Sequence, residues 1–225
     1  MKNILNPMNP FFRFMNLIVD LIGVNLLFLL CCVPIITIGP ALSALYTVSM
    51  RLVRHTLDSP VKSFWMTFRR NLKQGILLGL LSASICALLL YNTWLTIQLR
   101  IGQQNLLYSV LLAACILCLL LFLCVAAYVF PLLAQFDNTL KGYVQTAFLM
   151  CIRHLPKTIC VLLLPAITAW LTMRSVGAFA FVSVFLLLIG FVTIAYLQAH
   201  LFVSIFDIYI KQQRESSSPE QEAES

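Results

Sequence analysis

Long runs of apolar residues, each bounded by charged residues, organise almost the whole chain. This pattern is typical of membrane-spanning helices, which need about 20 mainly apolar residues to cross a bilayer. The runs predict an all-α, polytopic transmembrane bundle that forms one domain over residues 1–211, followed by a disordered acidic cytoplasmic tail at 212–225. The predicted spans cover residues 15–34, 37–53, 75–95, 106–133, 158–173 and 178–206.

The number of spans depends on residues 35–53, which contain Gly39-Pro40 and are only moderately hydrophobic. This segment either crosses the membrane or is re-entrant, and Pro34 with Gly39-Pro40 predicts a turn before it. With six spans, 13 of the 15 Lys and Arg fall on one side of the membrane, whereas five spans give 11 against 4. The positive-inside rule therefore favours six spans with both termini in the cytoplasm, and five remain an alternative.

The composition excludes a soluble domain and changes the meaning of the net charge. The chain has 225 residues, of which 61% are hydrophobic and 10% are charged, whereas soluble domains have about 25% charged residues. The formal net charge is +7. Because the basic residues follow the topology, we assign them to orientation and to attraction by anionic lipid headgroups, and we expect no nucleic-acid binding.

Two connecting segments predict short amphipathic helices at the cytoplasmic membrane surface. The first covers residues 59–74, with Ser59 as a plausible N-cap and Pro60 in the first turn. At helical spacing, one of its faces is apolar and the other is basic. This helix is either a solvated connector or a docking surface for a cytoplasmic partner. The apolar face carries Val61, Phe64, Trp65, Phe68 and Leu72, and the basic face carries Lys62, Arg69, Arg70 and Lys73.

The second amphipathic helix is predicted to begin near Asp137 or Thr139 and to end at Pro156. Its basic end adds Arg153, His154 and Lys157. Its apolar stripe contains Leu140, Tyr143, Val144, Ala147, Phe148 and Cys151. The candidate docking or lipid-binding residues of the two helices are therefore Lys62, Arg69, Arg70, Lys73, Arg153 and Lys157.

Asp20, Asn25 and His200 form the candidate intramembrane polar site. A carboxylate inside a span is energetically costly, so Asp20 is a functional candidate by default. The alternative is a residue paired locally with Asn16 or Arg13 near the inner interface. His200 is more typical of a hydrogen-bonded helix contact than of a ligand, and a pair between Asp20 and His200 requires the first and last spans to touch.

Enzymatic and metal-binding motifs are absent from the sequence, so we predict no catalytic residue, no cofactor and no metal site. The eight cysteines lie in or beside apolar runs, and the Cys115–Cys118 pair lacks further ligands, which indicates small buried hydrophobes. Gly75 and Gly79 form a GxxxG pattern that allows close helix packing, either within the chain or between chains.

Several segments carry a family resemblance that covers roughly residues 7–211. They read NPFFRFMN (9–16), PIITIGPALSALY (34–46), FRRNLKQ (68–74), FPLLAQFDNT (130–139) and RHLPKT (153–158). Together they resemble the YesL-like family of bacterial integral membrane proteins of unknown function. The resemblance implies a bacterial cytoplasmic membrane protein, an accessory role in carbohydrate uptake and sugar-transporter subunits as partners. It implies no site residues. The alternative is a self-sufficient small transporter or channel that uses Asp20 and the proline-broken spans.

Overall fold

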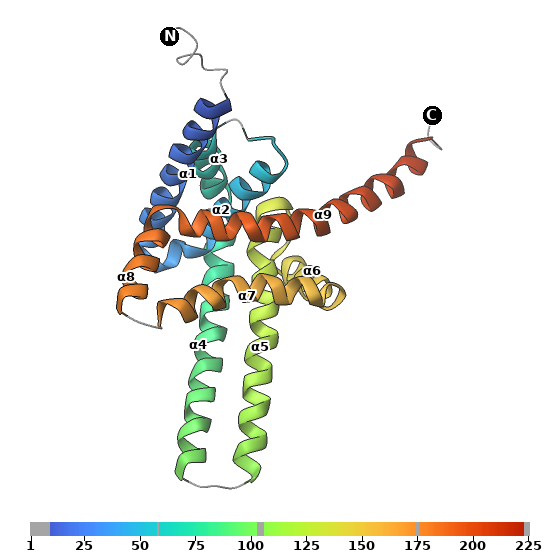
Figure 1. Ribbon diagram of the computed structural model, residues 1–225. Coiled ribbons are helices and arrows are strands. Elements are labelled where there is room, and N and C mark those ends of the chain that lie inside the picture. The colour runs from blue at the N-terminus through green and yellow to red at the C-terminus, as the bar shows by residue number, and fades with distance from the viewer. Residues whose placement is uncertain (1–9, 58, 103–105, 174–175, 223–225) are drawn as a thin grey trace.

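The computed structural model describes residues 10–57, 59–102, 106–173 and 176–222, and within these ranges the regular structure is helical without strands (Figure 1). The all-α prediction is confirmed. The elements are α1 (Pro10–Cys32), the 3-10 turn η1 (Ile35–Thr37), α2 (Ile38–Val53), α3 (Pro60–Arg70), α4 (Leu72–Gly102), α5 (Leu106–Gln135), α6 (Leu140–Arg153), α7 (Leu155–Thr172), α8 (Val176–Phe185), the π-helical turn η2 (Leu186–Gly190) and α9 (Phe191–Glu222).

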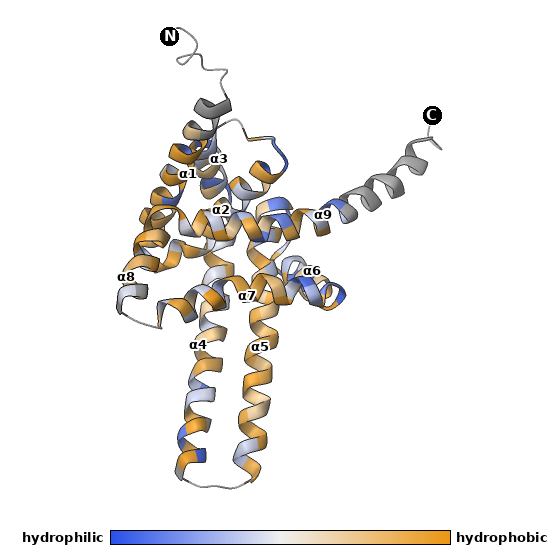
Figure 2. Ribbon diagram, viewed as in Figure 1, coloured by the Kyte–Doolittle hydropathy of each residue, from blue (hydrophilic) through white to orange (hydrophobic). Residues whose placement is uncertain are grey.

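Among the described residues, five helical segments are long and apolar enough to cross a membrane. A sixth, Leu17–Cys32 in α1, is apolar but shorter. Figure 2 shows apolar residues along most of these helices. The chain is therefore a helical membrane protein, while the choice between six and five spans and the orientation of the termini stay predictions. The five segments are Ile35–Val53, Leu72–Ile101, Leu106–Gln135, Leu155–Thr172 and Phe179–Asp207.

Helix α2 is the centre of the molecule, because it packs against α1, α3, α4, α5 and α9. Of its candidate span 61% is buried inside the protein, compared with 11% for the spans in α4 and α5. Small and hydroxyl side chains, including Ala41, Ser43 and Ala44, allow its neighbours to approach closely. The moderate hydrophobicity of residues 35–53 therefore reflects contact with protein in place of lipid.

The predicted turn before α2 is present at Pro34 but does not extend to Gly39-Pro40. It lies at Val33–Thr37, and Gly39-Pro40 belongs to the first turn of α2, where proline removes no helical hydrogen bond. Gly39 is needed there because α4 crosses at this point. A Cβ atom on Gly75 would lie 2.7 Å from the nitrogen of Pro40, and one on Gly79 would lie 3.3 Å from the Cα of Gly39. The GxxxG pattern therefore serves packing within the chain.

Helices α4 and α5 form a long antiparallel hairpin, and α7 and α9 run across it (Figure 1). The part of the hairpin nearest its tip extends away from the other helices and exposes apolar side chains such as Leu88, Trp94 and Leu117. Thr96 is buried between the two helices, with its Oγ1 3.8 Å from the Sγ of Cys115. All eight cysteines are free thiols; Cys31, Cys124 and Cys151 are buried as expected, whereas Cys118 and Cys160 are exposed.

The predicted span at 178–206 matches the apolar segment Phe179–Asp207, within which η2 separates α8 from α9. Two further predictions need correction. Pro156 does not end the second amphipathic helix: α6 ends at Arg153, and Pro156 lies in the first turn of α7, where it is tolerated. Residues 212–222 are helical where disorder was predicted, because a helix already nucleated in the bundle adds further residues at little cost.

The crossing of α2 and α4 predicts a large effect from one methyl group. Gly75→Ala places its Cβ against Pro40 and should lower the free energy of unfolding by about 1–3 kcal/mol, the usual cost of overpacking. Thermal unfolding in detergent micelles measures this. Gly177→Ala is the matched control, because nothing lies within 4 Å of the added Cβ. Equal midpoints for the two variants would show that the crossing is looser than described.

Candidate functional site

The interruption between α8 and α9 is bonded to Asn25 of α1. A π-helical turn shifts the register of backbone hydrogen bonds and leaves backbone groups without their usual partners. Asn25 is fully buried and donates from Nδ2 to the carbonyl oxygens of Leu186, at 3.0 Å, and Leu187, at 2.8 Å. Its Oδ1 accepts a hydrogen bond from the backbone N–H of Val192 at 3.2 Å. Asn25 therefore supplies hydrogen-bond partners to the backbone groups of the π-helical turn, which lipid hydrocarbon could not provide.

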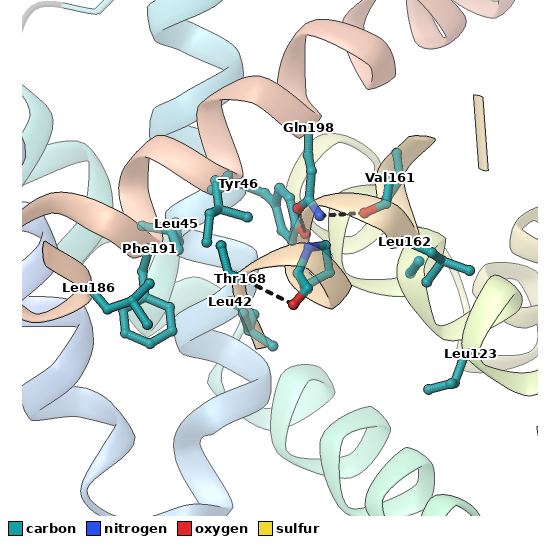
Figure 3. A pocket seen from close by; sticks show the side chains of 14 residues that line it. Leu42, Leu45, Tyr46, Leu123, Val161, Leu162, Thr168, Leu186, Phe191 and Gln198 are labelled. Atoms are coloured by element: carbon teal, nitrogen blue, oxygen red, sulfur yellow. Dashed lines mark hydrogen bonds between the residues drawn. The ribbon is translucent and has the colours of Figure 1, made fainter. Parts of the chain in front are cut away.

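A second helix irregularity, at Pro165 in α7, is bonded to Gln198 of α9 (Figure 3). Proline has no N–H, so the carbonyl of Val161, four residues earlier, loses its helical donor. The Nε2 of Gln198 donates to this carbonyl at 3.0 Å. The hydroxyl of Tyr46 on α2 donates to the Oε1 of Gln198 at 2.6 Å. One buried amide thus joins α2, α7 and α9.

The C-terminal end of α5 is buried and depends on side chains from other helices. The last four carbonyls of a helix have no intrahelical donor. Thr47 donates to the carbonyl of Ala134 at 3.3 Å, and the amide of Asn71 donates to that of Leu133 at 3.1 Å. Asn71, which lies between α3 and α4, also donates to the hydroxyl of Ser43 at 3.3 Å. These bonds fix α5 against α2.

Charged and hydroxyl groups add two further links between the helices. The guanidinium of Arg54 lies 2.7 Å from the carboxylate of Asp207 and donates to the amide oxygen of Gln135 at 2.8 Å, which joins the ends of α2 and α5 to α9. The hydroxyls of Tyr128 and Thr158 lie 2.9 Å apart and connect α5 to α7. Both links were absent from the sequence-based candidates.

The structure does not bring the predicted intramembrane site together. Asn25 bonds to η2, His200 is exposed with its ring centroid 6.4 Å from that of Tyr196, and Asp20 is half-buried on α1. The Asp20–His200 pair is not formed, since the ion pair found in the described part of the chain joins Arg54 to Asp207. The side chains of Arg13 and Asn16 lie outside the described residues, so the role of Asp20 stays a prediction.

The first predicted amphipathic helix, at 59–74, ends earlier than predicted: α3 stops at Arg70, and Lys73 lies in the first turn of α4. Its apolar face is also narrower than predicted. Phe64 and Phe68 are buried against neighbouring helices, whereas Val61 and Trp65 are 44% and 39% exposed. Ser59 has the extended backbone of an N-cap, but its side chain makes no capping hydrogen bond. The basic side chains Lys62, Arg69, Arg70 and Lys73 are all exposed, and the guanidinium of Arg69 stacks 4.9 Å from the centroid of the Trp65 ring.

The basic residues at the junction of α6 and α7 contact α9. Helix α6 begins after Thr139, one of its two predicted starts, and Thr139 caps it by accepting from the N–H of Gly142. Arg153 lies 5.7 Å from the ring centroid of Tyr209, and Lys157 donates to the hydroxyl of Ser204 at 3.0 Å. Partial burial lowers the pKa of His154, and the positive charges of Lys157 and Arg153 lower it further. This junction therefore docks the α6–α7 corner onto α9.

The buried polar side chains of this region mainly hold the helices together. Among the described residues, the side chains with buried, unpaired polar atoms are Ser49 and Tyr209, both uncharged. The same residues contain no group of three or more His, Cys, Asp or Glu close enough to hold a metal ion. The amides of Asn25, Gln198 and Asn71 are engaged by backbone or by neighbouring side chains. Proline inside an apolar run was the available signal, because it predicts a carbonyl that needs a donor from elsewhere.

Comparison with known proteins identifies relatives without an assigned function. The family described as "Protein of unknown function, DUF624" matches residues 21–93. The chain is 29% identical to "Uncharacterized protein YteU" of Bacillus subtilis (strain 168) over 179 residues, which cover 78% of each chain. It is 24% identical to "Uncharacterized protein YesL" of the same organism over 181 residues, which cover 80% of this chain and 78% of YesL. No solved structure matches. The resemblance to the YesL-like family is confirmed.

The pairing of Gln198 with the Val161 carbonyl predicts an energetic coupling to Pro165. Gln198→Leu should destabilise the protein, and it should do so less in a Pro165→Ala background, where the substituted residue supplies the missing N–H. We expect a coupling free energy of about 0.5–1.5 kcal/mol, the range of hydrogen bonds inside membrane proteins. A double-mutant cycle measured by unfolding in detergent tests this.

Pro131→Ala provides the control for that cycle, because Pro131 also lies inside a helix but is not four residues after the carbonyl that Gln198 contacts. The cycle of Gln198→Leu with Pro131→Ala should be additive. Additivity in the Pro165 cycle as well would contradict the assignment of Gln198 to the carbonyl that Pro165 leaves unpaired.

Proposed function

We propose that this chain is a non-enzymatic membrane component that presents the basic face of α3 to anionic lipid headgroups and to a partner subunit in carbohydrate uptake. The observation that carries the proposal is the exposure of Lys62, Arg69 and Arg70 on α3, whose opposite face is buried, and of Lys73 beside them in the first turn of α4. Basic side chains near an anionic leaflet gain about 1 kcal/mol each.

The anchoring of α3 makes its basic face a defined surface. Phe64 and Phe68 stack with ring centroids 6.2 Å apart and are buried, and α3 packs against α1 and α2. Arg51 at the end of α2 donates to the hydroxyl of Ser63 at 3.4 Å and adds a further exposed cation beside α3. A partner subunit with an acidic surface would meet this face without any rearrangement of the helix.

The hydrogen bonding in the protein interior favours a binding role over an enzymatic or a transport role. The buried amides of Asn25, Gln198 and Asn71 form hydrogen bonds with backbone groups and neighbouring side chains. The link to carbohydrate uptake and to sugar-transporter subunits rests on what resemblance to the YesL-like family implies. The location of α3 in the cytoplasm of a bacterium rests on the distribution of Lys and Arg.

A self-sufficient transporter is the second candidate, and one observation favours it. The interrupted segment α8–η2–α9 is the kind of helix discontinuity found at the substrate sites of transporters. In this chain, however, Asn25 occupies the backbone groups at the interruption. The transporter hypothesis predicts solute flux into liposomes that contain only this protein, and loss of that flux in Asp20→Asn.

Charge reversal on α3 tests the leading proposal. Replacing Arg69, Arg70 and Lys73 with Glu should abolish co-purification of a stoichiometric partner from native membranes in mild detergent, because the cationic face becomes anionic. Mass spectrometry of the purified material identifies the partner. Arg153→Glu with Lys157→Glu is the comparison variant, and it should retain the partner because these two side chains contact α9. Unchanged recovery with the α3 variant would refute the docking role.

A further inference from the structure

A mainly apolar cavity of about 370 Å³ lies between α2, α5, α7, η2 and α9 (Figure 3). The docking surface of α3 contributes none of its lining, and the sequence-based candidates did not include it. Apolar side chains from all five elements form most of its wall, among them Leu42, Leu45, Leu123, Leu162, Leu186 and Phe191. The side chains with polar atoms that line it are Tyr46, Thr168 and Gln198.

These three polar side chains already have partners. Tyr46 donates to Gln198 at 2.6 Å, and Gln198 donates to the carbonyl of Val161 at 3.0 Å. The hydroxyl of Thr168 donates to the carbonyl of Pro165 at 2.8 Å. All three polar side chains are therefore engaged within the protein, and the rest of the lining is apolar, so a ligand that placed a polar group inside would find few partners to replace its hydrogen bonds with water. The cavity selects hydrocarbon.

The size and position of the cavity narrow the choice of hydrocarbon. An apolar cavity of about 150 Å³ holds one benzene molecule, so 370 Å³ accommodates roughly fifteen carbon atoms. Leu123 on α5 is 42% exposed and Pro165 on α7 is exposed, so the wall of the cavity reaches the outer surface of the bundle. Both helices are long and apolar enough to cross a membrane, so we expect this surface to meet bilayer hydrocarbon.

We propose that the cavity binds one acyl chain of a membrane phospholipid. The acyl chain makes dispersion contacts with the side chains that line the cavity, and these contacts are missing when the cavity is empty. The lipid then fills the space between α5, α7 and α9 and completes the packing around the Tyr46–Gln198–Val161 hydrogen bonds. The lipid headgroup stays outside the cavity, since the lining has no free polar side chain to receive it. This proposal is independent of the docking role of α3.

Photo-crosslinking of the purified full-length protein in detergent tests the proposal. The probe is phosphatidylglycerol with a diazirine near the end of one sixteen-carbon acyl chain, added at about one molecule per protein so that the lowest-energy site fills first. We expect labelling concentrated on Leu123, Leu162 and their neighbours in α5 and α7. A free sixteen-carbon fatty acid with the same diazirine, used in parallel, should label these positions more weakly.

Ala127→Phe should block the site, because Ala127 lines the cavity and a phenyl ring removes roughly 150 Å³ of it. We expect labelling at Leu162 to fall at least about threefold, since the remaining volume holds a much shorter chain. Ala113→Phe is the matched control on the same helix, at an exposed position outside the cavity lining, and it should leave labelling unchanged. If Ala127→Phe does not fold, Ala195→Leu narrows the cavity from α9.

Three results would overturn the proposal. The first is labelling spread evenly over the exposed faces of α4 and α5, which indicates surface lipid only. The second is cavity labelling that survives both filling substitutions in folded protein. The third is labelling by the fatty acid alone, which would assign the cavity to a free amphiphile. Partner recovery through α3 is measured separately, so these outcomes do not depend on the docking role.

Discussion

The pairing of backbone groups at helix irregularities holds this molecule together. Hydrocarbon offers no hydrogen-bond partner, so each carbonyl or N–H released by a proline, a π-helical turn or a buried helix end needs a donor or acceptor from elsewhere in the chain. Asn25 serves the π-helical turn, Gln198 serves the carbonyl left by Pro165, and Asn71 serves the end of α5. Each of these bonds joins different helices, so the same few amides that satisfy the backbone also set the arrangement of the bundle.

Much of the fold could be predicted from the sequence, because lipid-facing helices appear in it as long runs of apolar residues. The all-α class, the long runs of α4 and α5 and the start of α6 near Thr139 follow from local patterns. The moderate hydropathy of residues 35–53 left open whether they span the membrane or are re-entrant, so the central place of α2 emerged only from its contacts. The π-helical turn has no compositional signature, and the donor for the Val161 carbonyl lies on another helix. The sequence singled out Asn25 as part of a polar site with Asp20 and His200, whereas in the structure it pairs backbone groups of η2 and α9.

The use of the polar interior for structure shifts the search for function to the surfaces. The basic face of α3 and the mainly apolar cavity beside Gln198 differ in chemistry and are formed by different helices, so the two proposed binding roles do not compete for the same residues. Gln198 contributes both to helix stability and to the lining of the cavity. Its amide donates to the Val161 carbonyl of α7, so this polar side chain of the lining is already engaged.

Hydrogen–deuterium exchange at the backbone amide of Val192 tests most directly whether side-chain amides hold the broken helices. This N–H donates to Asn25 and starts the regular part of α9. Exchange in detergent should be slow in the unmodified protein and at least about tenfold faster in Asn25→Val, which corresponds to about 1.4 kcal/mol of lost protection. Amides near the tip of the α4–α5 hairpin should not change. Equal protection of Val192 in both proteins would contradict the account.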